Sequence, residues 1–523
     1  MLNFKDQIMQ IMKPLSLVMI LSLLSSCSDL LDKEPLNSRN ESVFYKTEQD
    51  AFEAVIAIYD AAQLTSSFQV TADILSDDGY AGGSSRNDIP EQIQLDNNAI
   101  LTTSYIASEV WSFNYTGIYR ANLLIEKIDD IEGSASELAR MKAEALFFRG
   151  YFYWNLVRFF ENVPLVTKTL SPDEYGVPQA DPNEVYTQIF TDLTEAAKSL
   201  PEELPFDGRV STWAAKALLA RVWLFQEGVY GNSISVNGVA IDANYIKNAL
   251  DDIIDNSGHA LAPDISTIFS RSGEMSEESV FEIQYSDLGR YGDWGWPYGG
   301  EGSFPVVWQG PRVKDPAVEG YFRGWSFNTV TKSLYDAFEE NDPRKDVYII
   351  TMDDFKGELT KGFQHTGYFT NKYTTKKEYQ ATDGSPELNY GNNYKVIRYA
   401  DVLLMASELH VLTGGANAQS YLDEVRNRVG LPSVPATLEN IFHERRVELC
   451  MEGLRYHDLL RRGLDVADAA ITVKGDYGPD FDYKESEEQD FDITFNKATK
   501  GFLPIPQNEI DLLDGLYNQN AGY

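Results

Sequence analysis

The chain is poor in the side chains that bind transition metals. It has 523 residues, of which five are histidines and two are cysteines. The spacings HExxH and CxxC and the EF-hand loop do not occur in it. We therefore expect no metal site and no cofactor.

Basic residues are also scarce. The chain has 44 Lys and Arg against 80 Asp and Glu, which gives a formal net charge of −36. A surface this acidic repels phosphate backbones, so a general nucleic-acid binder is excluded. The composition is otherwise that of a globular protein, with 43% apolar and 24% charged residues.

Long hydrophobic runs are missing. The most apolar stretch, Leu15 to Leu24, follows Lys13 near the N-terminus. A bilayer-spanning helix needs ~20 apolar residues, so this stretch is too short to cross a membrane. It ends at Cys27, and the arrangement resembles a bacterial lipoprotein signal, in which this cysteine becomes the lipidated first residue.

This resemblance predicts a signal peptide over residues 1–26 and a tether over 27–46, with Cys27 as the lipidation site. Either Met1 or Met12 is the start of translation. Acyl chains would then supply the anchor, and stable attachment takes more than one chain. Cys450 would be the single remaining thiol, which leaves stability to the hydrophobic core.

Helical periodicity dominates from residue 47 onward. Apolar residues recur at helical spacing over residues 47–63, 109–131, 136–160, 181–200, 211–230 and 245–254. Residues 143–153 and 215–225 repeat one another at an offset of 72 residues, each in the second helix of a pair. Repeated helical pairs stack to share a core, so the pattern predicts a tetratricopeptide-like scaffold.

The pattern changes between about 258 and 395, where glycine, proline and aromatic residues increase. Residues 280–285 alternate as a strand does. Helical patterns return over 395–412, 417–429 and 438–462, and residues 475–499 form a polar, acidic stretch. The predicted fold is thus mainly α, with an irregular, loop-rich half that contains short strands. The predicted domain has three parts: an N-terminal helical part (about 47–257), a loop-rich insert (about 258–395) and a C-terminal helical part (about 396–523).

Several blocks in the last third form a specific pattern. They are Arg398 to Glu408, Glu424 to Arg428, Glu444 to Arg461, Gly501 to Ile510 and Asn518 to Tyr523. Together with residues 120–122 and 151–164, these blocks resemble the SusD/RagB family of outer-membrane nutrient-binding lipoproteins. The resemblance covers nearly the whole chain after Cys27, and the blocks occur in the family's order.

The resemblance implies one domain over residues 47–523, built on four tetratricopeptide-like units. It implies binding without catalysis. Family members capture oligosaccharides, or in some cases peptides, and deliver them to a SusC-like TonB-dependent outer-membrane barrel. It also implies a lipid-anchored protein exposed on the outer membrane at the cell surface.

The first candidate ligand site is rich in aromatic rings. Four of the eight tryptophans lie between residues 294 and 325, and the stretch 289–302 alternates rings with glycines. Such a segment forms no packed helix, so its rings are either packed or available to a ligand. Sugar rings have apolar C–H faces that stack on such side chains. The candidates are Tyr291, Asp293, Trp294, Trp296, Tyr298, Trp308 and Trp325.

The second candidate site is the polar, glycine-containing stretch 76–88. Its candidate ligand-binding residues are Asp77, Asp78, Tyr80, Arg86 and Asn87. In the family the equivalent early loop borders the ligand face. By contrast, the tryptophans within helical patterns are expected in the core; they are Trp111, Trp154, Trp213 and Trp223.

The charged residues of the third signature block have a structural interpretation. Planar guanidiniums bridge helices through paired hydrogen bonds, so Glu444, Arg446 and Glu448 are expected in a buried ion network and not in the ligand site.

Two other functions compete with glycan capture. A secreted glycoside hydrolase would need a pair of carboxylates, but 80 acidic residues guarantee some pair at ~5–9 Å, so such pairs carry no information. A protein-interaction adaptor would use the helical repeats alone.

Overall fold

The computed structural model describes residues 44–204, 208–288, 301–314, 320–355, 358–382, 385–474, 491–513 and 515–523. The predicted signal peptide, Cys27, and the ring-bearing residues 291–298 lie outside these ranges. Among the described residues, no helix has the length and apolar content needed to cross a membrane.

The chain is mainly helical, as predicted. The first half contains α2 Glu48–Gln63, α3 Ser67–Ile74, α4 Pro90–Asp96, α5 Tyr105–Lys127, α6 Ala135–Phe160, α7 Pro182–Ser199, α8 Thr212–Tyr230 and α9 Ala243–Asn256. The second half contains α10 Pro305–Gln309, α11 Lys332–Ala337, α12 Arg344–Tyr348, α13 Tyr399–Thr413, α14 Ala418–Arg428, α15 Leu438–Glu448, α16 Arg455–Arg461, α17 Leu464–Ile471 and α18 Gln507–Leu512.

The long helices begin where the sequence provides caps. The Thr47 hydroxyl accepts from the backbone N–H of Asp50, whose carboxylate bonds back to Thr47 in a capping box. Asp181 and Ser211 cap α7 and α8 in the same way, through their side-chain oxygens. The predicted starts near 47, 181 and 211 are therefore confirmed, whereas α5 begins four residues before the predicted 109.

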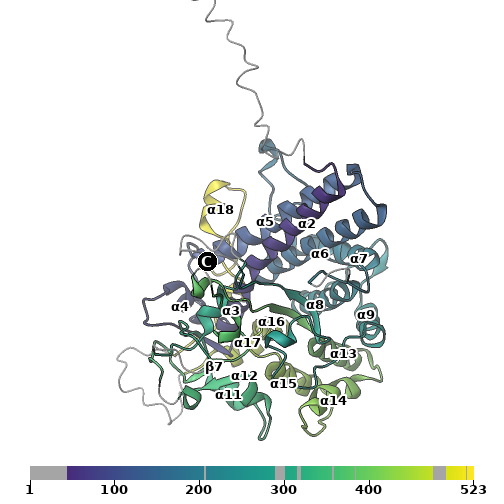
Figure 1. Cartoon of the computed structure of the whole chain (residues 1–523). Helices are drawn as coiled ribbons and strands as arrows, with labels where there is room; N and C mark the ends of the chain where they lie inside the picture. Colours follow the sequence, from purple (N-terminus) through teal and green to yellow (C-terminus); the bar gives the residue numbers. More distant parts are fainter. Residues whose placement is uncertain are drawn as a thin grey trace, which may run out of the picture.

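Successive long helices pack against one another: α5 on α6, α6 on α7, α7 on α8 and α8 on α9 (Figure 1). The α5–α6 contact needs a small residue, because a Cβ at Gly117 would collide with the Phe152 ring. The two copies of the sequence repeat lie in α6 and α8, which both contact α7. This serial packing is compatible with the predicted tetratricopeptide-like scaffold. The four predicted core tryptophans are confirmed as buried: Trp111, Trp154, Trp213 and Trp223.

The strands are short and pair two by two, all antiparallel. The pairs are β1 Gly79–Gly82 with β5 Phe327–Val330, β2 Ser235–Val236 with β3 Val239–Ala240, β4 Ser279–Ile283 with β8 Tyr394–Arg398, and β6 Ile349–Thr351 with β7 Tyr368–Thr370. Strand β4 confirms the strand predicted at 280–285, although all five of its residues are buried and do not alternate in exposure. It lies on the helical scaffold, because Phe281 packs edge-on against Phe147 of α6 at 5.1 Å.

Two predicted helices are corrected. The helix expected over 395–412 starts as a strand, since residues 394–398 pair with β4, and helix α13 begins only at Tyr399. The helix expected over 438–462 is broken into α15 and α16. Met451 (φ 57°) and Gly453 (φ 77°) turn the chain in the left-handed region there. A Cβ at Gly453 would approach Gln69 Cα to 2.8 Å, so the turn fits closely against α3.

The expected ion network of the third signature block is present and buried. Glu448 Oε2 lies 3.0 Å from Arg344 Nη1, while Oε1 lies 3.1 Å from Arg398 Nη1 and 2.5 Å from Arg428 Nη2. Glu452 pairs with Arg398 at 2.7 Å. Burial alone would raise the pKa of Glu448, but its arginines hold that pKa well below the usual value. We call this set of five residues the signature network.

Candidate functional site

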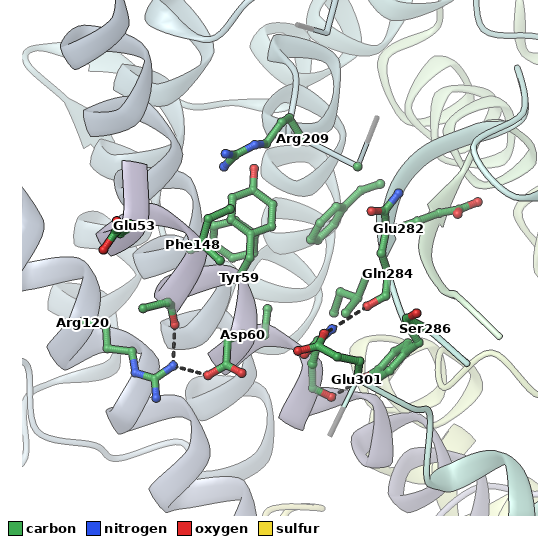
Figure 2. A pocket seen from close by; sticks show the side chains of 18 residues that line it. Glu53, Tyr59, Asp60, Arg120, Phe148, Arg209, Glu282, Gln284, Ser286 and Glu301 are labelled. Carbon is green, nitrogen blue, oxygen red and sulfur yellow. Dashed lines mark hydrogen bonds and ion pairs between the residues drawn. The ribbon is translucent and has the colours of Figure 1, made fainter. Parts of the chain in front are cut away.

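A pocket of about 590 Å³ opens between helix α2 and strand β4. One wall is α2; the opposite wall is β4 and the residues after it (Figure 2). Arg120 of α5, Phe148 of α6 and Arg209 before α8 complete it. Its lining includes Tyr59, Asp60, Gln63, Arg120, Phe148, Arg209, Gln284, Ser286 and Glu301. We call this site the α2–β4 pocket.

The pocket has aromatic side chains held in fixed positions. The Tyr59 ring lies edge-on to Phe148, with centroids 4.4 Å apart, and the Arg209 guanidinium lies 4.9 Å from the Tyr59 ring centre (Figure 2). The Tyr59 hydroxyl donates to Glu144 at 2.8 Å and accepts from the Val210 backbone N–H at 3.0 Å. Burial raises the pKa of Tyr59 well above its usual value, so the phenol is neutral. The half-buried Tyr59 ring therefore offers a rigid apolar surface, while Phe148, which is only 1% exposed, packs behind it and holds it in place.

Polar side chains surround these rings. Arg120 Nη1 lies 2.5 Å from Asp60 Oδ2, and these side chains are 33% and 46% exposed. Gln63 Nε2 donates to the Gln284 carbonyl at 2.9 Å and to Glu301 Oε2 at 3.2 Å. Carboxylates, amides and guanidiniums next to aromatic rings supply both hydrogen bonds and apolar contact. This combination suits a neutral polyhydroxylated ligand better than a purely apolar one.

The described residues on either side of the segment 289–300 meet at the pocket. Ser286 and Glu301 both line it, and the Ser286 backbone N–H donates to the Glu301 carbonyl at 2.5 Å. Trp294, Trp296, Tyr298, Tyr291 and Asp293 lie outside the described residues, so their role as a stacking platform stays a prediction.

The other two predicted rings differ in exposure. Trp308 is only 8% exposed, and Trp325 is half-buried. Both lie edge-on to Phe304, at 5.4 Å and 5.6 Å. Trp308 is thus a core ring and its proposed stacking role is not favoured, because α10 packs it inward. Trp325 presents part of its ring.

The polar stretch 76–88 divides into a buried and an exposed part. Asp77 pairs with Arg455 at 2.7 Å, and Asp78, which is fully buried, pairs with Arg446 at 2.8 Å. We therefore correct the expectation that these two carboxylates face a ligand: they join this turn to α15 and α16. The sequence could not reveal this, since the arginines lie about 370 residues away.

The remaining candidates of that stretch are accessible. Tyr80, in β1, is half-buried with its ring 5.1 Å from that of Phe491, whereas Arg86 and Asn87 are exposed. Among the residues that the structure describes, no group of three or more His, Cys, Asp or Glu is arranged to hold a metal ion.

Sequence reasoning missed the α2–β4 pocket. Its residues come from α2, α5, α6, the stretch 208–209, residues 281–286 and Glu301. Gln63 of α2 and Gln284, which bond to each other, are 221 residues apart, and no local pattern joins them. Tyr59 was expected only as part of an apolar helix face, and Arg120 only as part of a family block. A covarying pair such as Gln63 and Glu301 would have been the signal, but one sequence contains no such information.

Two family models match the chain. One is described as the SusD family and covers residues 357–523; the other is described as starch-binding, associating with outer membrane, and covers 29–224. The SusD-like protein P25 of Formosa agariphila is 25% identical over 84% of this chain and 87% of its own.

Solved structures are similar over nearly the full length. A laminarin binding SusD-like protein is 35% identical, with a TM-score of 0.79, over 92% of this chain and 100% of that one. Surface glycan-binding protein A from Bacteroides thetaiotaomicron, in complex with laminarihexaose, is 28% identical with a TM-score of 0.79, over 91% and 100%. The identity and the coverage show that this chain belongs to the SusD family.

Proposed function

We propose that this protein is a surface glycan-binding lipoprotein that captures an oligosaccharide and binds it without turnover. The observation that carries the proposal is the 35% identity over 92% of the chain with a laminarin binding SusD-like structure. The relative in complex with laminarihexaose supports the same ligand class. Laminarin-type glucans, which are chains of β-1,3-linked glucose, are accordingly the first ligands to test.

The geometry of the described residues supports a sugar ligand. The α2–β4 pocket combines the Tyr59 ring, held in place by Phe148, with exposed hydrogen-bonding groups such as Asp60 and Arg120. An apolar C–H face of a pyranose would contact the Tyr59 ring, and its hydroxyls would exchange hydrogen bonds with the polar groups. No net ligand charge is needed, because Arg120 and Asp60 already neutralise each other.

The stacking platform is proposed next to this pocket. Its members are Trp294, Trp296 and Tyr298, with Tyr291 and Asp293 beside them, in the segment whose flanking residues meet at Ser286 and Glu301. Trp325, Tyr80, Arg86 and Asn87 are proposed as a further part of the ligand face, since all four are at least partly accessible.

Delivery and anchoring complete the proposal. The captured sugar would pass to a SusC-like TonB-dependent barrel, and acyl chains on Cys27 would hold the protein in the outer membrane, exposed at the cell surface. The family model whose description names association with the outer membrane supports this location. Cys27→Ala should release the protein from the outer-membrane fraction with its melting temperature unchanged, and labelled fatty acid should appear only on the wild-type chain.

The test is calorimetric titration of the chain from residue 28 onward with laminarihexaose, cellohexaose, maltohexaose and a mixed peptide library. The double change Trp294→Ala with Trp296→Ala should weaken laminarihexaose binding by roughly ten- to a thousandfold. Stacking of a nucleic-acid base on one ring is worth ~1–3 kcal/mol, and a sugar face should contribute at or below that value. We therefore expect the two rings together to contribute ~1.4–4 kcal/mol, where ~1.4 kcal/mol is a factor of ten. Tyr175→Ala is the matched control, since that ring is 59% exposed and lies outside the proposed face.

Each outcome has a distinct meaning. Retained affinity in the double variant would move the site to the Tyr80–Asn87 stretch, and a collapsed melt would make the two rings core residues. Binding of peptides but of no glucan would replace the proposed ligand class. Shortened oligosaccharide after incubation with the protein would contradict binding without turnover.

A further inference from the structure

A second, much smaller cavity lies at the junction of the N-terminal scaffold and the C-terminal part. It measures about 20 Å³ and is lined by side chains of α6, α8, α13, α15 and α16. Most of these side chains are buried, including Trp154, Phe225 and Met405. A space of roughly 10–15 Å³ is needed to hold one water molecule, so this cavity accepts a single particle of that size.

Four arginines line this cavity, and three of them have carboxylate partners. Arg221 Nη2 lies 2.5 Å from Asp401, and Arg445 Nη1 lies 2.6 Å from the same carboxylate. Arg445 Nε also reaches Asp458 at 2.9 Å. Arg461 Nη1 lies 2.5 Å from Glu408, and its Nε lies 2.8 Å from Asp458. The charges of these three arginines are thus balanced by three carboxylates.

The fourth arginine, Arg158 of α6, has no carboxylate partner among the residues that the structure describes. It is only 7% exposed, and its Nε has no hydrogen-bond acceptor within the described part of the chain. Its guanidinium carbon lies 5.6 Å and 5.0 Å from the ring centres of Trp154 and Phe159. Ring faces attract a cation but do not accept the directed hydrogen bonds of a guanidinium. Leaving a buried charge without such partners is costly.

A second unsatisfied donor lies on the same cavity wall. Arg221 Nε is buried and also has no acceptor among the residues described, although the other two nitrogens of Arg221 bond to Asp401 and to the Val396 carbonyl. The one histidine of the wall adds no charge, because burial and the nearby Arg158 hold the pKa of His457 well below its usual value. Burial also lowers the pKa of Arg158, to about 10, and Arg221 acts in the same direction. Arg158 therefore remains protonated at neutral pH.

The cavity wall thus carries one positive charge more than its carboxylates neutralise. We infer that this cavity is a binding site for one small monovalent anion, of halide size, held by Arg158 and Arg221. A halide accepts several N–H donors at once and supplies the missing negative charge. Sulfate and phosphate are too large for the space. The bound ion would join α6 to α8 through these two arginines.

Thermal melts test the inference in solution. The chain from residue 28 onward is melted in sodium chloride, bromide and gluconate at one ionic strength. A ligand that binds only the folded state raises the melting temperature with its concentration, and we expect a rise of about 1–2 °C in either halide relative to gluconate. Arg158→Met, which keeps the side-chain length and removes the charge, should abolish the difference. Arg323→Met, at an exposed position, should retain it.

Diffraction locates the ion directly. Crystals grown in sodium bromide should give an anomalous peak within hydrogen-bonding distance of Arg158 and Arg221. This experiment decides the question even if Arg158→Met does not fold. The inference is overturned if no peak lies in the cavity, in which case it holds water, or if wild type and Arg158→Met respond equally to halide.

Discussion

The signature network and the α2–β4 pocket both contain arginine–carboxylate pairs, but the side chains of these pairs are buried in the network and partly exposed in the pocket. Arg398 and Glu448 are fully buried, whereas Arg120 and Asp60 in the pocket are 33% and 46% exposed. A buried charge must keep its partner because water cannot replace it, but an exposed charge exchanges its partner for water at little cost. Between these two sites, the buried arginines stabilise the fold, whereas a partly exposed arginine such as Arg120 can exchange its partner for a ligand.

The largest expected effect tests the buried side of this comparison. Glu448→Ala would leave Arg344, Arg398 and Arg428 around a site without its carboxylate. Removing one partner of a buried ionic group costs about 3–5 kcal/mol, so urea unfolding should show a loss of this size. Glu195→Ala is the control, since Glu195 is 52% exposed in its pair with Lys198, and it should change stability by less than ~1 kcal/mol. Similar losses in the two variants would refute the comparison.

A smaller loss is expected at the turn that carries Asp78. Arg446→Ala removes the ion pair of this fully buried carboxylate, while Asp77 keeps Arg455. The loss should be about 3 kcal/mol, because burial already raises the pKa of Asp78 and the orphaned group would take up a proton. Thermal melts measure it, and calorimetry should find laminarihexaose affinity retained. An unchanged melt with lost affinity would return Asp78 to the ligand site.

Low pH should lower the free energy of unfolding by protonating buried, ion-paired carboxylates such as Asp458. Burial alone would raise the pKa of Asp458, but Arg445 and Arg461 outweigh it and lower the pKa from its usual value of 3.8 to about 2. A depressed pKa stabilises the folded state above pH 3.8, and that contribution disappears as the pH falls through about 2. The shift corresponds to about 2 kcal/mol. Denaturant unfolding at a series of pH values from about 6 down to about 2 measures it. Asp458→Asn should flatten the curve over that window, and an equally steep curve would contradict the assignment.

Parts of the fold also differ in how well the sequence predicted them. Helices with caps at Thr47, Asp181 and Ser211 were predictable, because capping and periodicity are local. The break at Gly453 was not, since its left-handed backbone follows from close contact with Gln69, far away in the chain. The strand at residues 394–398 was also missed, because only pairing with β4 makes it one.

The ligand site was harder to predict for the same physical reason. Asp77 and Asp78 were expected to face a ligand because glycine and polar neighbours suggest an open loop. Their burial depends on Arg446 and Arg455, which no local pattern connects to them. Conversely, the buried role of the third signature block was predictable, because so many arginines and glutamates can be buried only with ion-pair partners. The partners themselves were not predictable, since Glu448 pairs with arginines that lie outside the block.

The smallest effect on stability is expected in the α2–β4 pocket. A substitution there also tests directly whether the partly exposed Arg120–Asp60 pair contacts the ligand. Arg120→Ala removes a partly exposed pair with Asp60, and such pairs contribute at most ~1 kcal/mol, so the melting temperature should change little. Laminarihexaose affinity should nevertheless fall, by about tenfold for the loss of one charge-assisted hydrogen bond of ~1.5 kcal/mol. Lys142→Ala is the matched control, because its pair with Asp129 has comparable lysine exposure (34%) and does not line the pocket. If Arg120→Ala and Lys142→Ala bind the sugar equally well, the pocket takes no part in recognition, and exposure alone does not identify the residues that meet the ligand.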